Sequence, residues 1–455
     1  MTPHDLMSWG AHVRATLKVG LPLVGGQLAM IGLGVTDTVM LGWLGAEALA
    51  ASVLGTSLLF ICLIGGAGFA HAVSPTVASA SGADDDQTVR RAVRMGLWIV
   101  IVYAALMMPL LWNAETLLLA MGQEPVLAAQ AADYMRIAQW GMVLNLFYFV
   151  LREFLSGLER TRVVLAAMLA GLALNIVIDY ALIFGHWGAP AMGIRGAAVA
   201  TVCVQALVTV VLVGYTLALR ETAQYALFQR FWRADWEMLW RLFRLGWPIS
   251  LTMLAEVSLF AISALMMGWL GTIPLAAHGI AIQLASIAFM VPLGLSFAAT
   301  VRVGRADGRG DGPNLRRAGF AALMVALTAA LVTAAIFVIW PAPLSRLFLD
   351  EANADSAAVL AYAVPLLLVA GLFQLADTSQ AIGAGACRGI KDTRVPMMLA
   401  VLSYTLVGLP LGYTLGFTMG YGGVGVWFGL AGGLFLAGIL LIWRFWALSA
   451  KLHGR

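Results

Sequence analysis

Twelve long apolar runs divide the sequence, and each is long enough to cross a lipid bilayer as an α-helix. Such a helix needs about 20 mostly apolar residues, because it rises about 1.5 Å per residue through a hydrocarbon core about 30 Å thick. The pattern therefore predicts a chain that passes repeatedly through the membrane. The expected spans are 15–41, 48–73, 92–115, 128–151, 163–185, 196–219, 242–269, 275–300, 316–340, 358–385, 396–418 and 424–447.

The composition leads to the same class of protein. Of the 455 residues, 61% are hydrophobic and only 11% are charged, whereas a soluble globular chain carries about 25% charged residues. Because so little charge cannot cover a surface in water, most of the outside must face lipid. The basic residues are scattered and form no stripe, which excludes a nucleic-acid-binding surface. We predict an all-α polytopic membrane protein.

The basic residues also indicate the orientation of the chain in the membrane. With twelve spans, alternate loops fall on one side, and 24 of the 27 lysines and arginines then share that side. The other side keeps Arg136, Arg195 and Arg346. Cytoplasmic loops are enriched in lysine and arginine, so both termini are expected in the cytoplasm.

The chain repeats itself. Three motifs recur at one constant separation, namely Gly-Leu-Pro at 20–22 with Gly-Trp-Pro at 246–248, Gly-Trp-Leu-Gly at 42–45 and 268–271, and Arg-Arg-Ala at 90–92 and 316–318. We therefore expect two pseudo-symmetric six-helix lobes in one orientation, with the functional site between the repeats. The expected boundaries are an N-terminal lobe at 1–219, a cytoplasmic linker at 220–241 and a C-terminal lobe at 242–455.

Four acidic residues lie inside expected spans, and each is a candidate functional residue. A carboxylate at the bilayer centre costs about 2.5–3.5 kcal/mol, so an acid is seldom placed there without a function. The alternative is a buried structural acid that is paired with a polar neighbour. The four candidates are Asp37, Asp179, Glu256 and Asp377.

Two of these acids are expected at similar depth in the first lobe. Counted from the nearest basic residue at the cytoplasmic end, Asp37 lies about 28 Å and Asp179 about 26 Å into the membrane. Asn175 shares a helical face with Asp179, and Thr201 lies at a comparable level. Oxygen ligands suit a hard cation such as Na⁺, and carboxylates also bind protons. The four residues therefore predict a cation site, with Asn175 and Thr201 equally open to a role in joining helices.

The other two acids are expected closer to the bilayer centre in the second lobe. The same count places Glu256 about 18 Å and Asp377 about 16 Å from the cytoplasmic end. In the repeat Glu256 aligns with Met30 at the separation of the three motifs. Further along, Thr161-Arg162-Val163 matches Thr393-Arg394-Val395 at a separation that is six residues longer, and at this separation Asp377 aligns with Asn145. The two lobes therefore carry acids that are not duplicates. The second pair is expected to attract a cationic ligand or to bind a coupling ion.

Further candidates concern conformational change and substrate contact. Pro22 lies within the first span, where proline removes a backbone hydrogen bond and permits a kink. The kink would bend when Asp37 changes protonation, or it would be static. The candidates for lining a substrate cavity are Met253, Gln283, Phe289, Met290, Phe373 and Gln374.

The motifs around the acids resemble those of the multidrug and toxic compound extrusion family, in its NorM-like bacterial branch. The resemblance covers nearly the whole chain. It is carried by Gly34-Val35-Thr36-Asp37-Thr38-Val39-Met40, Ala255-Glu256, Ala370-Gly371-Leu372-Phe373-Gln374 with Ala376-Asp377, Arg388-Gly389 and Val395-Pro396. It implies twelve spans in two six-helix lobes that form a V, and drug export driven by Na⁺ or H⁺.

The resemblance also implies roles for individual residues. The family's first-lobe cation site maps onto Asp37, Asn175, Asp179 and Thr201. The second-lobe acids of the branch map onto Glu256 and Asp377. Some members carry a further acid before the tenth span, for which Asp355 is the nearest candidate, and its alignment stays open.

We therefore expect a secondary active exporter of cationic lipophilic drugs, in antiport with Na⁺ or H⁺. The coupling ion would bind at Asp37 and Asp179, or at Glu256 and Asp377, and the same oxygens serve both ions. We expect no catalytic residues and no cofactor, and a monomer in the bacterial inner membrane whose partners are small organic cations and the bilayer.

Two other functions remain to be weighed. A flippase for lipid-linked precursors, from the same superfamily, needs cationic residues in its cavity to hold a pyrophosphate. The expected spans instead place acids at mid-depth, which disfavours this alternative. An intramembrane enzyme is disfavoured because the sequence has no HExxH or GxSxG motif.

Overall fold

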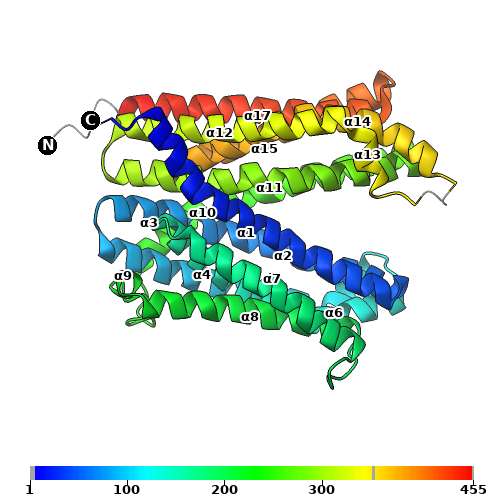
Figure 1. Cartoon of the computed structure of the whole chain (residues 1–455), viewed down its shortest axis with the longest axis horizontal. Coiled ribbons are helices and arrows are strands. Elements are labelled where there is room, and N and C mark those ends of the chain that lie inside the picture. Colours follow the sequence, from blue (N-terminus) through cyan, green and yellow to red (C-terminus); the bar gives the residue numbers. More distant parts are fainter. Residues whose placement is uncertain (1–5, 351–353, 453–455) are drawn as a thin grey trace. The chain divides into compact units, whose positions relative to one another are not determined.

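The computed structural model describes residues 6–350 and 354–452, and its regular elements are all helical (Figure 1). The two termini, which were predicted to lie in the cytoplasm, are outside the described residues. The helices of the first half are α1 (Trp9–Leu44), α2 (Ala46–His71), α3 (Val73–Gly82), α4 (Asp86–Trp112), α5 (Ala114–Ala120), α6 (Pro125–Gly157), α7 (Thr161–Phe184), α8 (Ile194–Ala218) and α9 (Arg220–Ala223). Those of the second half are α10 (Trp236–Leu270), α11 (Thr272–Gly308), α12 (Gly312–Ile339), α13 (Pro341–Arg346), α14 (Ser356–Gly389), α15 (Arg394–Leu402), the π-helical η1 (Ser403–Gly408), α16 (Leu409–Tyr413), the π-helical η2 (Thr414–Thr418) and α17 (Gly422–Leu452).

Eleven helical segments of the described residues are long and apolar enough to cross a membrane. They correspond to eleven of the twelve expected spans, and the expected span at 128–151 lies within α6. With 33 residues, α6 is long enough to cross, but its polar residues lower its hydropathy below that of the others.

The polar residues near the end of α6 are buried and bonded to one another. Arg152 donates to Glu153 Oε1 at 2.7 Å and to Gln27 Oε1 at 2.9 Å. His71 Nδ1 lies 2.9 Å from the same Glu153 oxygen. Arg152 and Glu153 are only 3% and 1% exposed, so each charge depends on the other for its compensation. This network explains how a helix with internal charges packs among apolar neighbours.

We predict that Arg152→Met lowers the free energy of unfolding by about 3–5 kcal/mol, because it removes the guanidinium that compensates the buried Glu153 charge and leaves only His71 beside it. Denaturant titration of the purified protein in mixed micelles measures this change. The double variant Arg152→Met/Glu153→Gln removes both charges and should recover part of the loss. Equal losses in the single and double variants would contradict the role of charge pairing.

The duplication predicted from short motifs extends to the positions of the helices. The helices α2 and α4 begin at Ala46 and Asp86, and α11 and α12 begin at Thr272 and Gly312. The start of α11 is as far from the start of α2, and that of α12 from that of α4, as the repeated motifs are from each other. Their caps repeat as well. Asp85 accepts from Thr88 N at the start of α4, and Asp311 accepts from Asn314 N at the start of α12. Hydrogen bonds from Thr88 hold the pKa of Asp85 below its usual range.

The chain divides into two compact units. One contains Met1–Val24 and Leu251–Arg455, and the other contains Gly25–Ser250. The boundaries fall inside the continuous helices α1 and α10, each shortly beyond a proline, Pro22 in α1 and Pro248 in α10. These two prolines belong to one of the repeated motifs. The same backbone position thus marks the boundary in both halves of the chain.

Glycines allow the last two spans to approach closely. The segment 403–418 combines α-helical and π-helical turns, and it packs along α17. A Cβ atom at Gly433 would lie 2.7 Å from Gly408 Cα, and a Cβ atom at Gly429 would overlap Gly412. Two glycine rows with a spacing of four residues therefore face each other, as in close helix pairs of membrane proteins.

We predict that Gly429→Ala lowers the free energy of unfolding by about 1–3 kcal/mol, because the added methyl group must push two backbones apart. Gly279→Ala is the matched control in the same unit, because a Cβ atom there has no neighbour within 4 Å among the described residues. Thermal unfolding of both variants in detergent measures the difference. Equal stability would contradict the tight packing.

Candidate functional site

Three helices of the unit Gly25–Ser250 bring together the four residues of the expected first-lobe site. Asp37 lies on α1, Asn175 and Asp179 lie on α7, and Thr201 lies on α8. Asn175 Nδ2 donates to Asp37 Oδ1 at 3.2 Å, and Thr201 Oγ1 donates to Asp37 Oδ2 at 3.2 Å. The four residues that the depth argument grouped are therefore neighbours in the structure.

The oxygens of this cluster are not all satisfied. Asp179 is 0% exposed and close enough to Asp37 for the two carboxyl groups to interact. Asp179 Oδ1, Asp179 Oδ2 and Asn175 Oδ1 are buried and have no hydrogen-bond donor among the described residues. A buried acceptor without a donor is costly, and a buried unpaired carboxylate more so. The cluster therefore has the free oxygens that a proton or a small cation would satisfy.

Small residues bring α8 close to α7 near this cluster. A Cβ atom at Gly196 would lie 2.6 Å from Leu182 O, and one at Gly171 would lie 2.7 Å from Val208 Cγ2. The glycines thus let the two backbones approach on both sides of Asp179. Close backbone approach is what allows the short side chains of Asn175 and Thr201 to reach Asp37 on a third helix.

A buried tyrosine beside the first cluster was missed by sequence reasoning. Tyr134 on α6 is 3% exposed and close enough to Asp37 and Asp179 to interact with both electrostatically. Its position within the expected span at 128–151 was visible in the sequence, but a tyrosine carries no charge that would single it out. Depth counting along that span would have placed it near the acids.

The second acid pair lies in the other unit. Glu256 on α10 and Asp377 on α14 are close enough to interact electrostatically, and Asp377 is only 2% exposed. Asp377 Oδ1 is buried without a hydrogen-bond donor among the described residues. The two acids expected near the bilayer centre are therefore brought together.

This second pair also has an aromatic neighbour that the sequence did not reveal. Tyr404 in η1 is 1% exposed and interacts with both acids, and its hydroxyl accepts from Gln380 Nε2 at 2.8 Å. Arg388 interacts with Glu256 from the far end of α14. Each acid pair thus has a buried tyrosine, although Tyr134 and Tyr404 do not correspond in the repeat.

The six candidates for a substrate cavity differ in exposure. Met253, Phe289 and Met290 are half-buried, and Gln283 is exposed. The remaining two are buried. Phe373 packs on Trp427 with ring centroids 5.4 Å apart, and Gln374 Nε2 donates to Ala285 O at 3.0 Å. Contact of these residues with a substrate stays a prediction.

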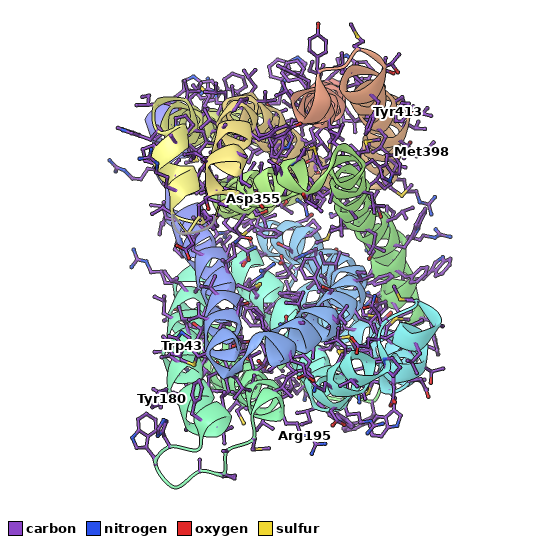
Figure 2. All side chains as sticks on the ribbon, turned by 90° about the vertical axis from the view of Figure 1, so that its right-hand side faces the viewer. Trp43, Tyr180, Arg195, Asp355, Met398 and Tyr413 are labelled. Carbon is purple, nitrogen blue, oxygen red and sulfur yellow. The ribbon has the colours of Figure 1, made fainter. Side chains whose placement is uncertain are left out.

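Aromatic side chains surround the end of α7 beside Asp179. Figure 2 shows Trp43 and Tyr180 at the ends of α1 and α7, and Arg195 at the start of α8. The ring of Tyr180 stacks on that of His186 with ring centroids 4.4 Å apart, and the ring centroids of Trp43 and Phe184 are 6.3 Å apart. Aromatic rings of this kind are typical of a membrane interface. Asp179, near the end of α7, therefore lies only about 8 Å below such a boundary.

Asp355 is remote from the second acid pair along α14. It is the exposed residue that precedes the first turn of α14 (Figure 2). Asp377 lies much further along the same helix, at a distance of about 33 Å by the rise of an α-helix. The structure therefore does not bring Asp355 to Asp377.

Long apolar helices and buried intramembrane acids define a multi-pass membrane protein. The profile of the MatE family matches residues 22–181 and 248–414, more than half of the chain. The chain belongs to this family, and the resemblance drawn from the motifs is confirmed. The two matched stretches begin at the repeated prolines Pro22 and Pro248.

Individual relatives agree with this membership. The chain is 50% identical over 447 residues to a Rhizobium meliloti protein named "Probable multidrug resistance protein NorM", covering 98% of this chain and 96% of the relative. It is 35% identical to "Multidrug resistance protein MdtK" of Yersinia pseudotuberculosis, covering 95% and 94%. A crystal structure titled "MATE in the straight conformation" shares its fold, with a TM-score of 0.88, 21% identity and coverage of 98% and 97%. The predicted all-α polytopic fold is confirmed.

Proposed function

We propose that the protein is a secondary active exporter of lipophilic organic cations, driven by antiport of Na⁺ or H⁺. The observation that carries the proposal is the set of unsatisfied oxygens of Asp179 and Asn175 beside Asp37. The printed names of the relatives, multidrug resistance proteins of bacteria, support drug export as the activity.

The first cluster is proposed as the site of the coupling cation. Asp179 is buried without a donor, so its carboxyl group must hold a proton or lie beside a bound cation to avoid an unpaired charge. Asp37 receives two hydrogen bonds and supplies a second carboxylate to the same ion. An oxygen-only set of ligands suits Na⁺, and the same carboxylates accept a proton.

The second acid pair is proposed to attract the organic cation. Removing a positive charge from water is costly unless a negative group faces it, and Glu256 and Asp377 supply two such groups in the membrane interior. Half-buried Met253 and Met290 provide flexible, polarisable side chains for ligands of different shape. Bound Na⁺ or H⁺ and bound drug would then favour different states of the protein, which is the requirement for exchange.

The two prolines are proposed as the places where the spanning helices bend. Pro22 and Pro248 interrupt the backbone hydrogen bonds of α1 and α10, each next to a boundary between the compact units. Asp37 follows Pro22 on the same helix, so ion binding and bending are connected through α1. The six-helix lobes 1–219 and 242–455 with the linker 220–241 are the proposed moving parts.

The cellular setting follows from the same reasoning. We place both termini in the cytoplasm, because the basic residues concentrate on that side. The bacterial relatives support the inner membrane as the location, and we propose that the protein acts there as a monomer. It would need no cofactor and catalyse no covalent reaction.

Accumulation of a fluorescent lipophilic cation in bacteria that lack their own exporters tests the proposal. Cells that express the protein should accumulate less dye than cells with an empty vector, and dissipating the ion gradients should abolish the difference. A neutral dye of similar size is the control and should accumulate equally. Equal accumulation of the cationic dye in expressing and non-expressing cells would refute the proposed export.

A further inference from the structure

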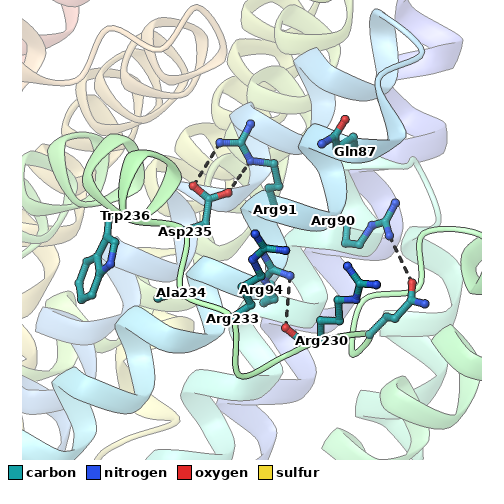
Figure 3. A pocket seen from close by; sticks show the side chains of 10 residues that line it. Gln87, Arg90, Arg91, Arg94, Arg230, Arg233, Ala234, Asp235 and Trp236 are labelled. Atoms are coloured by element: carbon teal, nitrogen blue, oxygen red, sulfur yellow. Dashed lines mark hydrogen bonds and ion pairs between the residues drawn. The ribbon is translucent and has the colours of Figure 1, made fainter.

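A pocket of about 730 Å³ lies in the unit Gly25–Ser250, between the start of α4 and the segment that leads into α10 (Figure 3). It is distinct from both acid pairs. Its lining residues are Gln87, Arg90, Arg91, Arg94, Gln229, Arg230, Arg233, Ala234, Asp235 and Trp236. Because five of these ten residues are arginines, we call it the arginine pocket.

Of the five arginines, Arg91 is the one that forms an ion pair with an acid of the lining. Arg91 donates to both carboxylate oxygens of Asp235, and this ion pair holds the pKa of Asp235 below its usual range. Arg91 also donates to Glu237 Oε2 at 3.2 Å. Asp235 is the only acid among the ten lining residues. The positive charge of the other four arginines therefore exceeds the negative charge that faces the pocket.

Within the described residues, the hydrogen bonds of Arg90 and Arg94 are long and go to neutral acceptors. Arg90 Nη1 donates to Gln229 Oε1 at 3.4 Å, and Arg94 Nη1 donates to Arg230 O at 3.4 Å (Figure 3). Arg94 Nε is buried and has no hydrogen-bond acceptor among the described residues. Like charges held together around a cavity repel one another, and a buried donor without an acceptor is costly. A bound anion would relieve both costs.

The chemistry of the side chains selects a phosphate group. The charged groups are arginines and not lysines, and the planar guanidinium donates in pairs to the oxygens of phosphate. The pocket is polar, and it has donors on two segments that face each other, 87–94 and 229–236. A phosphodiester that entered between them would accept hydrogen bonds from both.

The surroundings indicate the membrane surface. Trp232 and Trp236 are 79% and 74% exposed and belong to the same segment as Arg230 and Arg233. Trp98 Nε1 donates to Phe231 O at 2.9 Å and fastens this segment to α4. Exposed tryptophans beside arginines are typical of the headgroup region, where basic pockets at the cytoplasmic side bind anionic lipids.

The repeat shows that the pocket is not a general consequence of the scaffold. At the positions that correspond to Arg90 and Arg91, Arg316 lies over the ring of Trp446 at 3.9 Å and Arg317 donates to Met7 O at 2.8 Å. The position that corresponds to Arg94 is Phe320. The first half of the chain alone therefore has three arginines of α4 facing this cavity.

We propose that the arginine pocket binds the phosphate group of an anionic phospholipid of the cytoplasmic leaflet. The headgroup would join the start of α4 to the segment 229–236, with the acyl chains lying beside the exposed tryptophans. This site is independent of the proposed export activity.

Binding of lipids to the purified full-length protein tests the proposal. The protein in neutral detergent is titrated with phosphatidylglycerol, phosphatidylcholine or glycerol 3-phosphate, and bound lipid is measured by native mass spectrometry. Phosphatidylglycerol should bind most tightly. Each arginine removed should weaken its binding about fivefold, so Arg233→Gln should lose about fivefold and Arg94→Gln/Arg233→Gln about 25-fold. The control variant is Arg309→Gln, which replaces an exposed arginine on the corresponding side in the second half. It should leave the affinity for phosphatidylglycerol unchanged.

Two results would overturn the proposal. Equal affinity of the wild type and Arg233→Gln for phosphatidylglycerol would show that the pocket does not hold the headgroup. Arg233 suits this test because it is exposed and can be replaced without disturbing the fold. Displacement of phosphatidylglycerol by an equal concentration of glycerol 3-phosphate would show that the site takes soluble phosphate and not lipid.

Discussion

Replacing Asp37 by asparagine should abolish most export of lipophilic cations, lowering the initial efflux rate about 10- to 100-fold. Asparagine has almost the same shape, its one carbonyl oxygen can still accept from Asn175 or Thr201, and its amide NH₂ can donate to the unsatisfied Asn175 Oδ1, so the fold should persist. It cannot carry the negative charge that a bound Na⁺ or H⁺ needs, so the coupling ion no longer distinguishes the two states of the protein. Dye efflux from energised cells, normalised to the amount of protein in the membrane, measures the effect.

The control is a carboxylate of the same type outside the spans. Asp84 is exposed and has a backbone φ of 56°, a conformation that asparagine adopts readily. Asp84→Asn should therefore transport like the wild type. If Asp37→Asn also transported at the wild-type rate with equal expression, the cluster around Asp37 would have no part in coupling.

Replacing Asp377 by asparagine or Glu256 by glutamine should weaken binding of the organic cation about tenfold or more. A charged hydrogen bond or ion contact in a water-poor site contributes about 1.5–3 kcal/mol, which corresponds to about 10- to 100-fold in affinity. Fluorescence titration of the purified protein with the dye measures this loss directly. The Asp37→Asn protein should still bind dye, since its defect lies in coupling.

Asp355→Asn distinguishes a local role of Asp377 from a general effect of acids on α14. Asp355 lies about 33 Å along the helix from Asp377, and asparagine is an equally good residue before a first helical turn. Dye affinity should not change in this variant. A loss as large as that of Asp377→Asn would place the binding site elsewhere.

Most of the fold was predictable, because the hydrophobic thickness of a bilayer imposes a length on every span. Eleven expected spans coincide with long apolar helices. The span 396–418 was expected as one regular helix, but its part 403–418 contains two π-helical stretches. Hydropathy does not distinguish π-turns from α-turns, because both satisfy the backbone within the segment. The buried network at the end of α6 was likewise hidden, because Gln27 on α1 and His71 on α2, which bond to Arg152 beside Glu153, are far away in sequence.

The candidate site was predictable where charge marked it. Asp37 and Asp179 were grouped because a helix converts sequence distance from a basic anchor into depth. Tyr134 and Tyr404 were not found, because tyrosine is common in apolar helices and only three-dimensional packing shows which tyrosine lies near an acid. The arginine pocket was also missed as a site, because its two lining segments, 87–94 and 229–236, are far apart in the sequence and meet only through the fold.

Transport by the purified protein in liposomes tests the central claim most directly, with Na⁺ and pH gradients imposed separately. The dye should move against its own concentration gradient when at least one of the two cation gradients is imposed in the opposite direction. Asp37→Asn protein in matched liposomes should show no such movement. If the wild-type protein moved dye at the same rate with and without each gradient, the claim of cation-coupled export would be contradicted.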